Sequence, residues 1–383
     1  MTGKTRRIAY LTGTRADFGL MAGTLKRLQE QANTEVSLLV TGMHLSAEFG
    51  MTVGEVEASG LPVAARIPLN VDDRSQQAMA QAVGQAVVGV AAVLARLEPD
   101  LLLLLGDRGE MLAGAIAALH LSIPVAHLHG GERSGTVDEP IRHAITKLSH
   151  LHLVATEESR ERVVRMGEVP GDVYIVGAPS LDDVVDRIAL PRAHLLHGID
   201  LPPQSRYALV LFHPVVQELT QAKAQVGALL EALQAEILAR DMHVVWLAPN
   251  ADAGSAAILA ALKRAEGQRV HGITHLPRAR YLDVLAGADV LVGNSSSGII
   301  EAASLGTPVV NIGNRQRLRQ RNANTHDCAG DARSIGLALA AAMQGGRFAP
   351  GNVYGDGKSG ERIAQLLATV PLPSSLLDKS NVY

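Results

Sequence analysis

Short apolar runs alternate with longer amphipathic segments along most of the chain. The five leucines at Leu101–Leu105 have the length of a strand that is buried on both faces. A helical pattern at residues 111–119 follows, and then Pro124 and a second short strand at 125–129. This order predicts a βαβ unit. The same alternation predicts further elements of the first half: strands at 8–11, 36–40, 152–155 and 173–176, and helices at 18–29, 78–97 and 157–166.

Prolines interrupt this pattern between residues 177 and 205, where we expect a boundary between two domains. Beyond the boundary, strands are predicted at 207–212, 243–247, 290–292 and 308–312, and helices at 217–240, 255–265, 298–305 and 361–368. We therefore expect an α/β protein with two Rossmann-like domains and a ligand cleft between them. The expected divisions are an N-terminal domain at 1–178, a linker at 179–205, a C-terminal domain at 206–368 and a tail at 369–383.

Composition narrows the class of protein. The chain has 383 residues, 47% of them hydrophobic and 19% charged, which is enough for two cores of ordinary size. A net charge of −3 and an aromatic content of 3% argue against nucleic-acid binding. The one cysteine, Cys328, excludes an intrachain disulfide and favours a reducing compartment. No segment approaches the about 20 apolar residues that span a bilayer, so we expect a cytoplasmic protein without a membrane partner.

Ionisable residues follow both strands of the central βαβ unit. Asp107 comes directly after the leucine strand, and His129, Glu132, Asp138 and Glu139 follow the next one. Ligands of open α/β sheets bind beyond the carboxyl ends of the strands, so these side chains mark the first candidate site. Carboxylates in such a cluster can supply the acid and the base for proton transfer at a sugar carbon. Taken singly, either aspartate could instead be a helix N-cap.

Several histidines near these carboxylates raise the alternative of a metal site. His127 and His129 have strand spacing and would point to one face, and His143 lies on the next predicted helix. The chain has no HExxH motif or comparable ligand spacing. The sequence therefore favours histidines that donate and accept hydrogen bonds, and it predicts no metal.

A second candidate site lies in the segment GNSSSGIIEAASLG at residues 293–306. Ser295, Ser296 and Ser297 stand between a predicted buried strand and a predicted helix, where hydroxyl and N–H groups can hold a phosphate. A single serine would suggest an N-cap, whereas three serines followed by Gly298 favour phosphate binding. Glu301 would lie about one helical turn further on, within reach of a sugar hydroxyl. The Walker pattern and the Rossmann glycine fingerprint are absent from the sequence, so it supports neither an ATPase nor a dehydrogenase.

Other positions in the second half give weaker signals. His213 follows the first predicted strand of that half and could reach a ligand, and Asn250 lies in a turn pattern. Four arginines follow the strand predicted at 308–312 and could neutralise a diphosphate or be solvated: Arg315, Arg317, Arg319 and Arg321.

Four segments together carry a family resemblance: GTRADFG at 13–19, GDRGEML at 106–112, HLHGGERSGTVDEPIRHAITKLS at 127–149 and GNSSSGIIEAASLGTPVVNIGNRQ at 293–316. In this order they resemble the hydrolysing UDP-N-acetylglucosamine 2-epimerases of bacterial sialic-acid and legionaminic-acid biosynthesis. The resemblance implies the GT-B fold, a UDP-linked sugar substrate, no cofactor and a homodimer. It implies release of UDP and a free sugar of the N-acetylmannosamine type through a glycal. A retaining glycosyltransferase of the same fold, a nucleotide-sugar sensor and a metal-dependent hydrolase are the alternatives.

The resemblance also assigns roles to positions of this chain. It implies a catalytic role for Asp107, Glu132, Asp138, His213 and His129. It implies substrate or nucleotide binding by Arg15, Asp17, Glu139, Arg142, Asn250, Ser295, Ser296, Ser297, Gly298, Glu301 and Arg315. Non-hydrolysing relatives carry a catalytic glutamate where this chain has His129, so either His129 or Glu132 is the proton-transfer group. The nucleotide, UDP or GDP, and the sugar, N-acetylglucosamine or its 2,4-diacetamido-trideoxy analogue, stay open.

Overall fold

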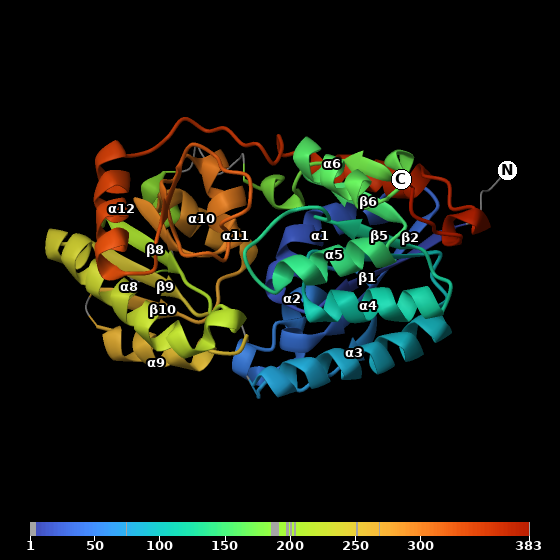
Figure 1. Ribbon diagram of the computed structural model, residues 1–383, viewed down its shortest axis with the longest axis horizontal. Helices are drawn as coiled ribbons and strands as arrows, with labels where there is room; N and C mark the ends of the chain where they lie inside the picture. Colours follow the sequence, from blue (N-terminus) through green and yellow to red (C-terminus); the bar gives the residue numbers. More distant parts are fainter. Residues whose placement is uncertain are drawn as a thin grey trace. The chain divides into compact units, whose positions relative to one another are not determined.

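The computed structural model describes residues 5–73, 75–184, 191–196, 199, 201–202, 204–249, 252–267 and 269–382. The chain forms two compact α/β units (Figure 1). The first unit comprises Met1–Glu132, Val137–Asp182 and Tyr354–Tyr383, and the second comprises Arg133–Thr136 and Asp183–Val353. Each unit is described by itself below.

The first unit is built on a seven-stranded, all-parallel sheet in the order β3-β2-β1-β4-β5-β6-β7. Its strands are β1 (Arg6–Thr12), β2 (Thr34–Thr41), β3 (Val63–Ile67), β4 (Leu101–Leu105), β5 (Val125–Leu128), β6 (Leu151–Val154) and β7 (Val173–Ile175). Its helices are α1 (Arg15–Gln29), α2 (Val53–Ala58), α3 (Gln76–Leu97), α4 (Gly109–His120), α5 (Asp138–Leu148), α6 (Glu157–Arg165) and α13 (Ser359–Thr369). The strand order reverses direction between β1 and β4, and such a reversal is where open α/β sheets bind ligands.

Helices cover both faces of this sheet, as the leucine strand predicted. Successive side chains of a strand point to opposite faces, so the five leucines of β4 divide between two cores. Leu101, Leu103 and Leu105 join a core that includes residues of α1 and α13. Leu102 and Leu104 join the other core, which includes residues of α3 and α4. All five leucines are buried, which confirms the strand predicted to be covered on both faces.

The second unit repeats this plan with a six-stranded parallel sheet in the order β10-β9-β8-β11-β12-β13. Its strands are β8 (Tyr207–Leu211), β9 (His243–Leu247), β10 (Val270–Ile273), β11 (Val290–Gly293), β12 (Val309–Ile312) and β13 (Thr325–Cys328). Its helices are α7 (Arg192–Leu195), α8 (Ala222–Glu236), α9 (Ser255–Ala265), α10 (Arg278–Gly287), α11 (Ser296–Ile300) and α12 (Ala332–Gly345). Here the order reverses between β8 and β11. The prediction of two Rossmann-like sheets is confirmed.

The expected division of the chain differs from the structure at its C-terminal end. The sequence assigned residues 206–368 to the C-terminal domain, but Tyr354–Tyr383 belong to the first unit. The physical reason is the apolar stripe of α13: Ile363 and Leu367 are fully buried in the core that lies under α1. Part of the expected linker at 179–205 lies outside the described residues.

Helix α3 corrects another expectation. It is 22 residues long and apolar enough, by length and composition, to cross a membrane. The statement that no segment approaches this length was therefore wrong. The helix packs beside α4 (Figure 1), and Ala86, Val90 and Leu94 are buried against the first unit. A core helix of a soluble protein meets the same criterion, so one such helix does not by itself indicate a membrane protein.

Candidate active site

The predicted site residues of the first unit gather at the carboxyl ends of its central strands. The turn after β1 leads to Arg15, the turn after β4 contains Asp107, and the turn after β5 contains His129 and Glu132. The first turn of α5 carries Asp138 and Glu139. Because β1, β4 and β5 are neighbours in the sheet, these side chains belong to one edge of it.

Arg142 of α5 connects two of the proposed catalytic segments. Its side chain is only 1% exposed, and its guanidinium forms a hydrogen-bonded ion pair with Asp107. Its other terminal nitrogen donates to the backbone oxygen of Glu132 at 2.9 Å. A guanidinium beside a carboxylate favours the ionised form, so Asp107 is held as an anion. The structure thus gives Arg142, predicted as a ligand-binding residue, a role in holding the proposed catalytic groups.

His129 and Glu132, the two candidates for one proton-transfer role, contact each other. Nδ1 of His129 is hydrogen-bonded to a carboxylate oxygen of Glu132, and both residues are buried. His129 has a φ of 62°, in the left-handed region that residues with a side chain rarely adopt. Such backbone conformations gather at functional sites, where the surrounding structure enforces them. The two residues therefore form one buried hydrogen-bonded pair.

Neither aspartate proposed as a helix N-cap has that role. Arg108 precedes α4 and Val137 precedes α5, and neither cap makes a side-chain hydrogen bond. Asp138 is the first helical residue of α5, with Glu139 beside it, where negative charge favours the helix dipole. The capping interpretation of Asp107 and Asp138 is therefore wrong, and their catalytic role stays a prediction.

Asp17 stabilises the turn after β1 by hydrogen bonds to its backbone. The carboxylate accepts hydrogen bonds from the backbone N–H groups of Gly13 at 3.0 Å and Thr14 at 2.9 Å, and it forms a capping box with Thr14. Burial raises the pKa of Asp17 to about 6 against the effect of these donors. These contacts give Asp17 a structural role. Burial also lowers the pKa of Arg15, and the nearby carboxylate of Glu55 opposes that shift.

Two buried polar residues at this edge were missed in the sequence. The carboxyl group of Glu110 packs against the backbone of the turns after β1 and β2, where a Cβ at Gly42 would lie 2.9 Å from its oxygen. His44 forms a 2.9 Å hydrogen bond with the hydroxyl of Thr12, and burial lowers its pKa to about 4. Both could have been found from their positions, since Glu110 lies in the motif GDRGEML and His44 follows a predicted strand.

The two histidines considered as metal ligands beside His129 have protein partners. His127 is fully buried and binds the backbone oxygen of Gly106 at 2.7 Å, and His143 lies 3.7 Å from Glu139. Among the residues that the structure describes, no group of three or more histidines, cysteines and carboxylates could hold a metal ion.

In the second unit, the turn after β11 holds the predicted serines next to His213. Asn294 accepts a hydrogen bond from the backbone N–H of His213 and donates one to its backbone oxygen, each at 2.8 Å. Ser295 is the N-cap of α11, and its hydroxyl accepts from the backbone N–H of Ser297 at 3.3 Å. Ser296 is the first residue of this helix and is half-buried.

Gly293 makes this turn possible. Its φ is 144°, and a Cβ would lie 1.9 Å from the backbone oxygen of Leu211 on the neighbouring strand. No side chain fits at that distance, so glycine is required for the close approach of β8 and β11. Gly298, predicted as a ligand-binding residue, is also closely packed: a Cβ there would lie 3.0 Å from a side-chain methyl of Val309, which would have to move by a few tenths of an ångström.

Glu301 is the centre of a buried cluster in this unit. It accepts a hydrogen bond from Ser297 and an ion-pair contact of 2.6 Å from Arg278. The hydroxyl of Tyr281 contacts Ser297, and the guanidinium of Arg278 lies 5.7 Å from the centre of the Tyr281 ring. Burial, followed by the charge of Glu301, raises the pKa of Tyr281. The sequence analysis missed Arg278 and Tyr281 because it did not recognise α10, whose pattern is only weakly amphipathic.

The arginines after β12 do not act as one group. Arg315 donates to the backbone oxygen of Asn294 at 3.1 Å, which places it beside the serine turn. Arg321 instead forms an exposed ion pair with Asp327 of β13. Asn250, the remaining predicted ligand-binding residue, lies outside the described part of the chain.

Each unit thus has Rossmann topology with polar side chains at the point of strand reversal, as in proteins that bind nucleotides or nucleotide sugars. The sequence profile of the UDP-N-acetylglucosamine 2-epimerase family matches residues 26–368. The chain is 45% identical to a UDP-N,N'-diacetylbacillosamine 2-epimerase (hydrolyzing) from Legionella pneumophila, over 99% of this chain and 100% of that protein. It is 32% identical to a UDP-N-acetylglucosamine 2-epimerase from Neisseria meningitidis, over 94% of this chain and 95% of that protein.

A solved structure shows the same fold. The UDP-GlcNAc 2-epimerase from Neisseria meningitidis bound to UDP-GlcNAc matches with a TM-score of 0.77 at 18% identity, over 94% of this chain and 99% of that chain. The chain belongs to the UDP-N-acetylglucosamine 2-epimerase family. The resemblance carried by the four motifs and the expected GT-B-like fold are both confirmed.

Proposed function

We propose that the protein is a hydrolysing 2-epimerase that converts UDP-N,N'-diacetylbacillosamine and water to UDP and the free 2-epimer of the sugar. The observation that carries this proposal is the 45% identity, over the full length of both chains, with a relative of that name. The identity with a relative named for UDP-N-acetylglucosamine is lower, at 32%. We therefore favour the 2,4-diacetamido sugar among the two substrates that the sequence left open. The glycosyltransferase alternative has no support from these relatives.

The first proposed step is an elimination. Asp107 is held as an anion by Arg142, so it is suited to remove the proton from C2 of the sugar. The electrons of the C2–H bond form the C1–C2 double bond while the C1–O bond breaks. The bonding pair leaves with UDP, and a glycal remains.

The second proposed step is the addition of water to the glycal. The hydrogen bond between His129 and Glu132 places a proton between the two side chains, and we propose that this pair protonates C2 from the opposite face. Asp138 removes a proton from the water that attacks C1. The free sugar then carries the inverted configuration at C2.

The second unit supplies groups suited to the leaving nucleotide. We propose that His213, Ser295, Ser296 and Arg315 bind the diphosphate and that Glu301 accepts a hydrogen bond from the ribose. In support, Asn294 joins the backbone of His213 to the serine turn, and Arg315 donates to the same asparagine. Donors that stabilise the departing diphosphate lower the barrier to C1–O cleavage.

The test is to incubate the protein in deuterated water with UDP-N,N'-diacetylbacillosamine and, separately, with UDP-N-acetylglucosamine. Proton NMR would follow both reactions. We expect release of UDP together with a free manno-configured sugar that carries deuterium at C2, faster with the diacetamido substrate. Release of UDP without deuterium at C2, or no consumption of either sugar nucleotide, would contradict the proposal.

We further propose that the enzyme is a cytoplasmic homodimer that serves legionaminic-acid rather than sialic-acid synthesis. The pathway follows from the diacetamido substrate. The dimer is supported by the exposed apolar side of α3, on which Val88 is 73% exposed. A second copy of the chain would remove this surface from water.

A further inference from the structure

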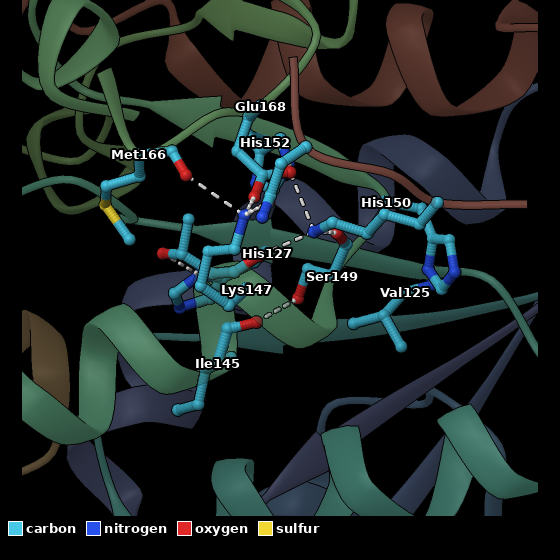
Figure 2. Close-up of polar contacts among 12 residues, drawn as sticks. Val125, His127, Ile145, Lys147, Ser149, His150, His152, Met166 and Glu168 are labelled. Atoms are coloured by element: carbon cyan, nitrogen blue, oxygen red, sulfur yellow. Dashed lines mark hydrogen bonds and ion pairs between the residues drawn. The ribbon is translucent and has the colours of Figure 1, made fainter. Parts of the chain in front are cut away.

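The first unit contains a second cluster of ionisable side chains outside the candidate active site, and Glu168 is its centre (Figure 2). The carboxylate is 3% exposed and receives three hydrogen bonds: from Lys147 at 2.6 Å, from His152 at 2.9 Å and from Lys379 at 2.7 Å. Burial alone would raise the pKa of Glu168, but these three donors lower it to about 2. Glu168 is therefore an anion at physiological pH and forms an ion pair with each lysine.

Lys379 belongs to the C-terminal tail that follows α13, and this tail is fixed to the unit at several points. Asn381 accepts a hydrogen bond from Lys147 at 2.6 Å. The backbone N–H of Val382 donates to the backbone oxygen of Gly167 at 2.8 Å. The tail thus returns over the segment that carries Glu168.

The ammonium group of Lys379 also binds the C-terminal end of α5. It donates to the backbone oxygens of Thr146, at 3.2 Å, and Ser149. The last carbonyls of a helix lack partners within the helix, and a cation there favours the helix dipole. Lys379 therefore holds one end of the helix whose other half carries Asp138 and Arg142.

Thr146 continues this chain of contacts toward Asp107. Its hydroxyl lies 3.2 Å from Nδ1 of His127, and Nε2 of His127 lies 2.7 Å from the backbone oxygen of Gly106. Burial lowers the pKa of His127 to about 3, so the ring is neutral. The carbonyl of Gly106 needs a donor, which places the proton on Nε2 and leaves Nδ1 as an acceptor that faces the hydroxyl of Thr146. That hydroxyl also donates to the backbone oxygen of Arg142 at 3.0 Å, so Thr146 joins His127 to the helical turn of Arg142.

We propose that Lys379 is a positioning residue for Asp107, acting through Thr146 and His127 on the Gly106–Asp107 turn. It contacts neither the proposed catalytic side chains nor the expected substrate. Its role is to hold α5 and the turn after β4 in place together. Arg142 on α5 and Gly106 before Asp107 then keep fixed positions relative to each other. As far as activity is concerned, this inference rests on the proposed function.

The first arm of the test compares the variants K379M and K379R with the wild-type enzyme. A displacement of a catalytic group by a fraction of an ångström costs on the order of tenfold in rate. We expect K379M to lower kcat about tenfold with KM changed less than twofold, and K379R to recover most of the loss. The matched control is R362M, which breaks the exposed ion pair of Arg362 with Asp356 in the same C-terminal segment. An equal loss of kcat in R362M, or none in K379M at a temperature where it is folded, would overturn the proposal.

The second arm does not depend on turnover. Histidine-selective ¹⁵N NMR reports which ring nitrogen of His127 carries the proton, and H127Q identifies the signal. We expect wild type, K379R and R362M to show one Nε2–H tautomer and K379M to show an exchange-broadened mixture. An unchanged His127 signal in K379M would refute the link between Lys379 and the Gly106–Asp107 turn, whether or not the enzyme is active. Failure of the wild type to consume either sugar nucleotide would refute only the proposed function.

Discussion

The two units have the same sheet topology but place different chemistry at the point where the strand order reverses. In the first unit this edge carries carboxylates that are paired with a guanidinium or an imidazole: Asp107, whose side chain is 24% exposed, and the buried Glu132. In the second unit it carries hydroxyl and amide groups, with Ser295 and Asn294 in one turn. We therefore propose that one scaffold presents proton-transfer groups in its first copy and nucleotide-binding groups in its second, where charged side chains such as Glu301 and Arg315 lie beside the hydroxyl and amide groups. The difference lies in a few turn residues, because the strands that present them are alike.

This comparison implies that substitution of the proposed proton-transfer groups of the first unit should affect the rate of the chemical step, while substitution of the proposed ribose-binding Glu301 of the second unit should affect binding. A group that acts only in the transition state changes kcat, whereas a group that binds substrate and transition state equally changes KM.

The largest effect is expected for D107N. The amide cannot accept the C2 proton, so kcat should fall by at least about 10³-fold while UDP still binds with nearly unchanged affinity. Steady-state kinetics and calorimetric titration with UDP measure the two quantities. D100N is the matched control, because Asp100 precedes the same strand at its opposite end and binds the backbone N–H of Arg7. Loss of UDP binding in D107N would show that this residue supports the fold or the nucleotide site instead.

A smaller effect is expected for E301Q in the second unit, and it should appear in KM rather than in kcat. Loss of the charge weakens the contacts with Arg278 and Ser297 and the proposed hydrogen bond with the ribose, so KM should rise about tenfold while kcat changes less than threefold. The control is E236Q, which removes one partner of a surface ion pair with Arg240 on α8. If E301Q lowered kcat and left KM unchanged, the division of roles between the units would be wrong.

The sequence predicted the parts of the molecule that local pattern controls. Five consecutive leucines between turn residues favour a strand covered on both faces, and Asp107 and Ser295 became candidates because they follow predicted buried strands. The edge strand β13 was missed, since its sequence THDC is polar and only partly buried. Helix α13 was predicted correctly as a helix, but its periodicity does not say which core covers Leu367. Long-range contacts such as that of Lys379 with α5 leave no local pattern.

The two units should differ in their stability at acid pH, because the first unit contains buried histidines with lowered pKa values. Burial lowers the pKa of His44 to about 4 and that of His127 to about 3, both in the first unit. Their unfolded pKa is near 6.5, so the unfolded chain binds more protons below that value. The stability that these histidines contribute is complete above pH 6.5 and is lost as the pH falls toward 4 and 3. For His44 the loss is on the order of 3 kcal/mol. Asp17 has the opposite effect: its pKa is raised to about 6 in the folded protein, so its contribution to stability increases as the pH falls below 6.

Trp246, the one tryptophan of the sequence, is fully buried on β9 and reports on the second unit. We expect urea unfolding at pH 4.5 to reduce the helical circular dichroism signal before the emission of Trp246 shifts. At pH 7 the two transitions should lie closer together. A Trp246 transition that moves with pH as far as the dichroism transition would contradict the assignment of acid sensitivity to the first unit.

The smallest effect on catalysis is expected at the exposed side of α3, because none of the candidate site residues lies on this helix. Val88 is 73% exposed there, between the less exposed Val87 and Gly89. A glutamate at this position would place a charge in the proposed dimer interface, where an unpaired buried charge is strongly unfavourable. V88E should therefore shift the mass measured by light scattering after gel filtration from dimer toward monomer, with kcat changed less than about twofold. V353E, at an exposed valine of the second unit, is the control. A wild-type monomer, or binding of the wild type to phospholipid vesicles that V88E abolishes, would show that a second copy does not cover this helix.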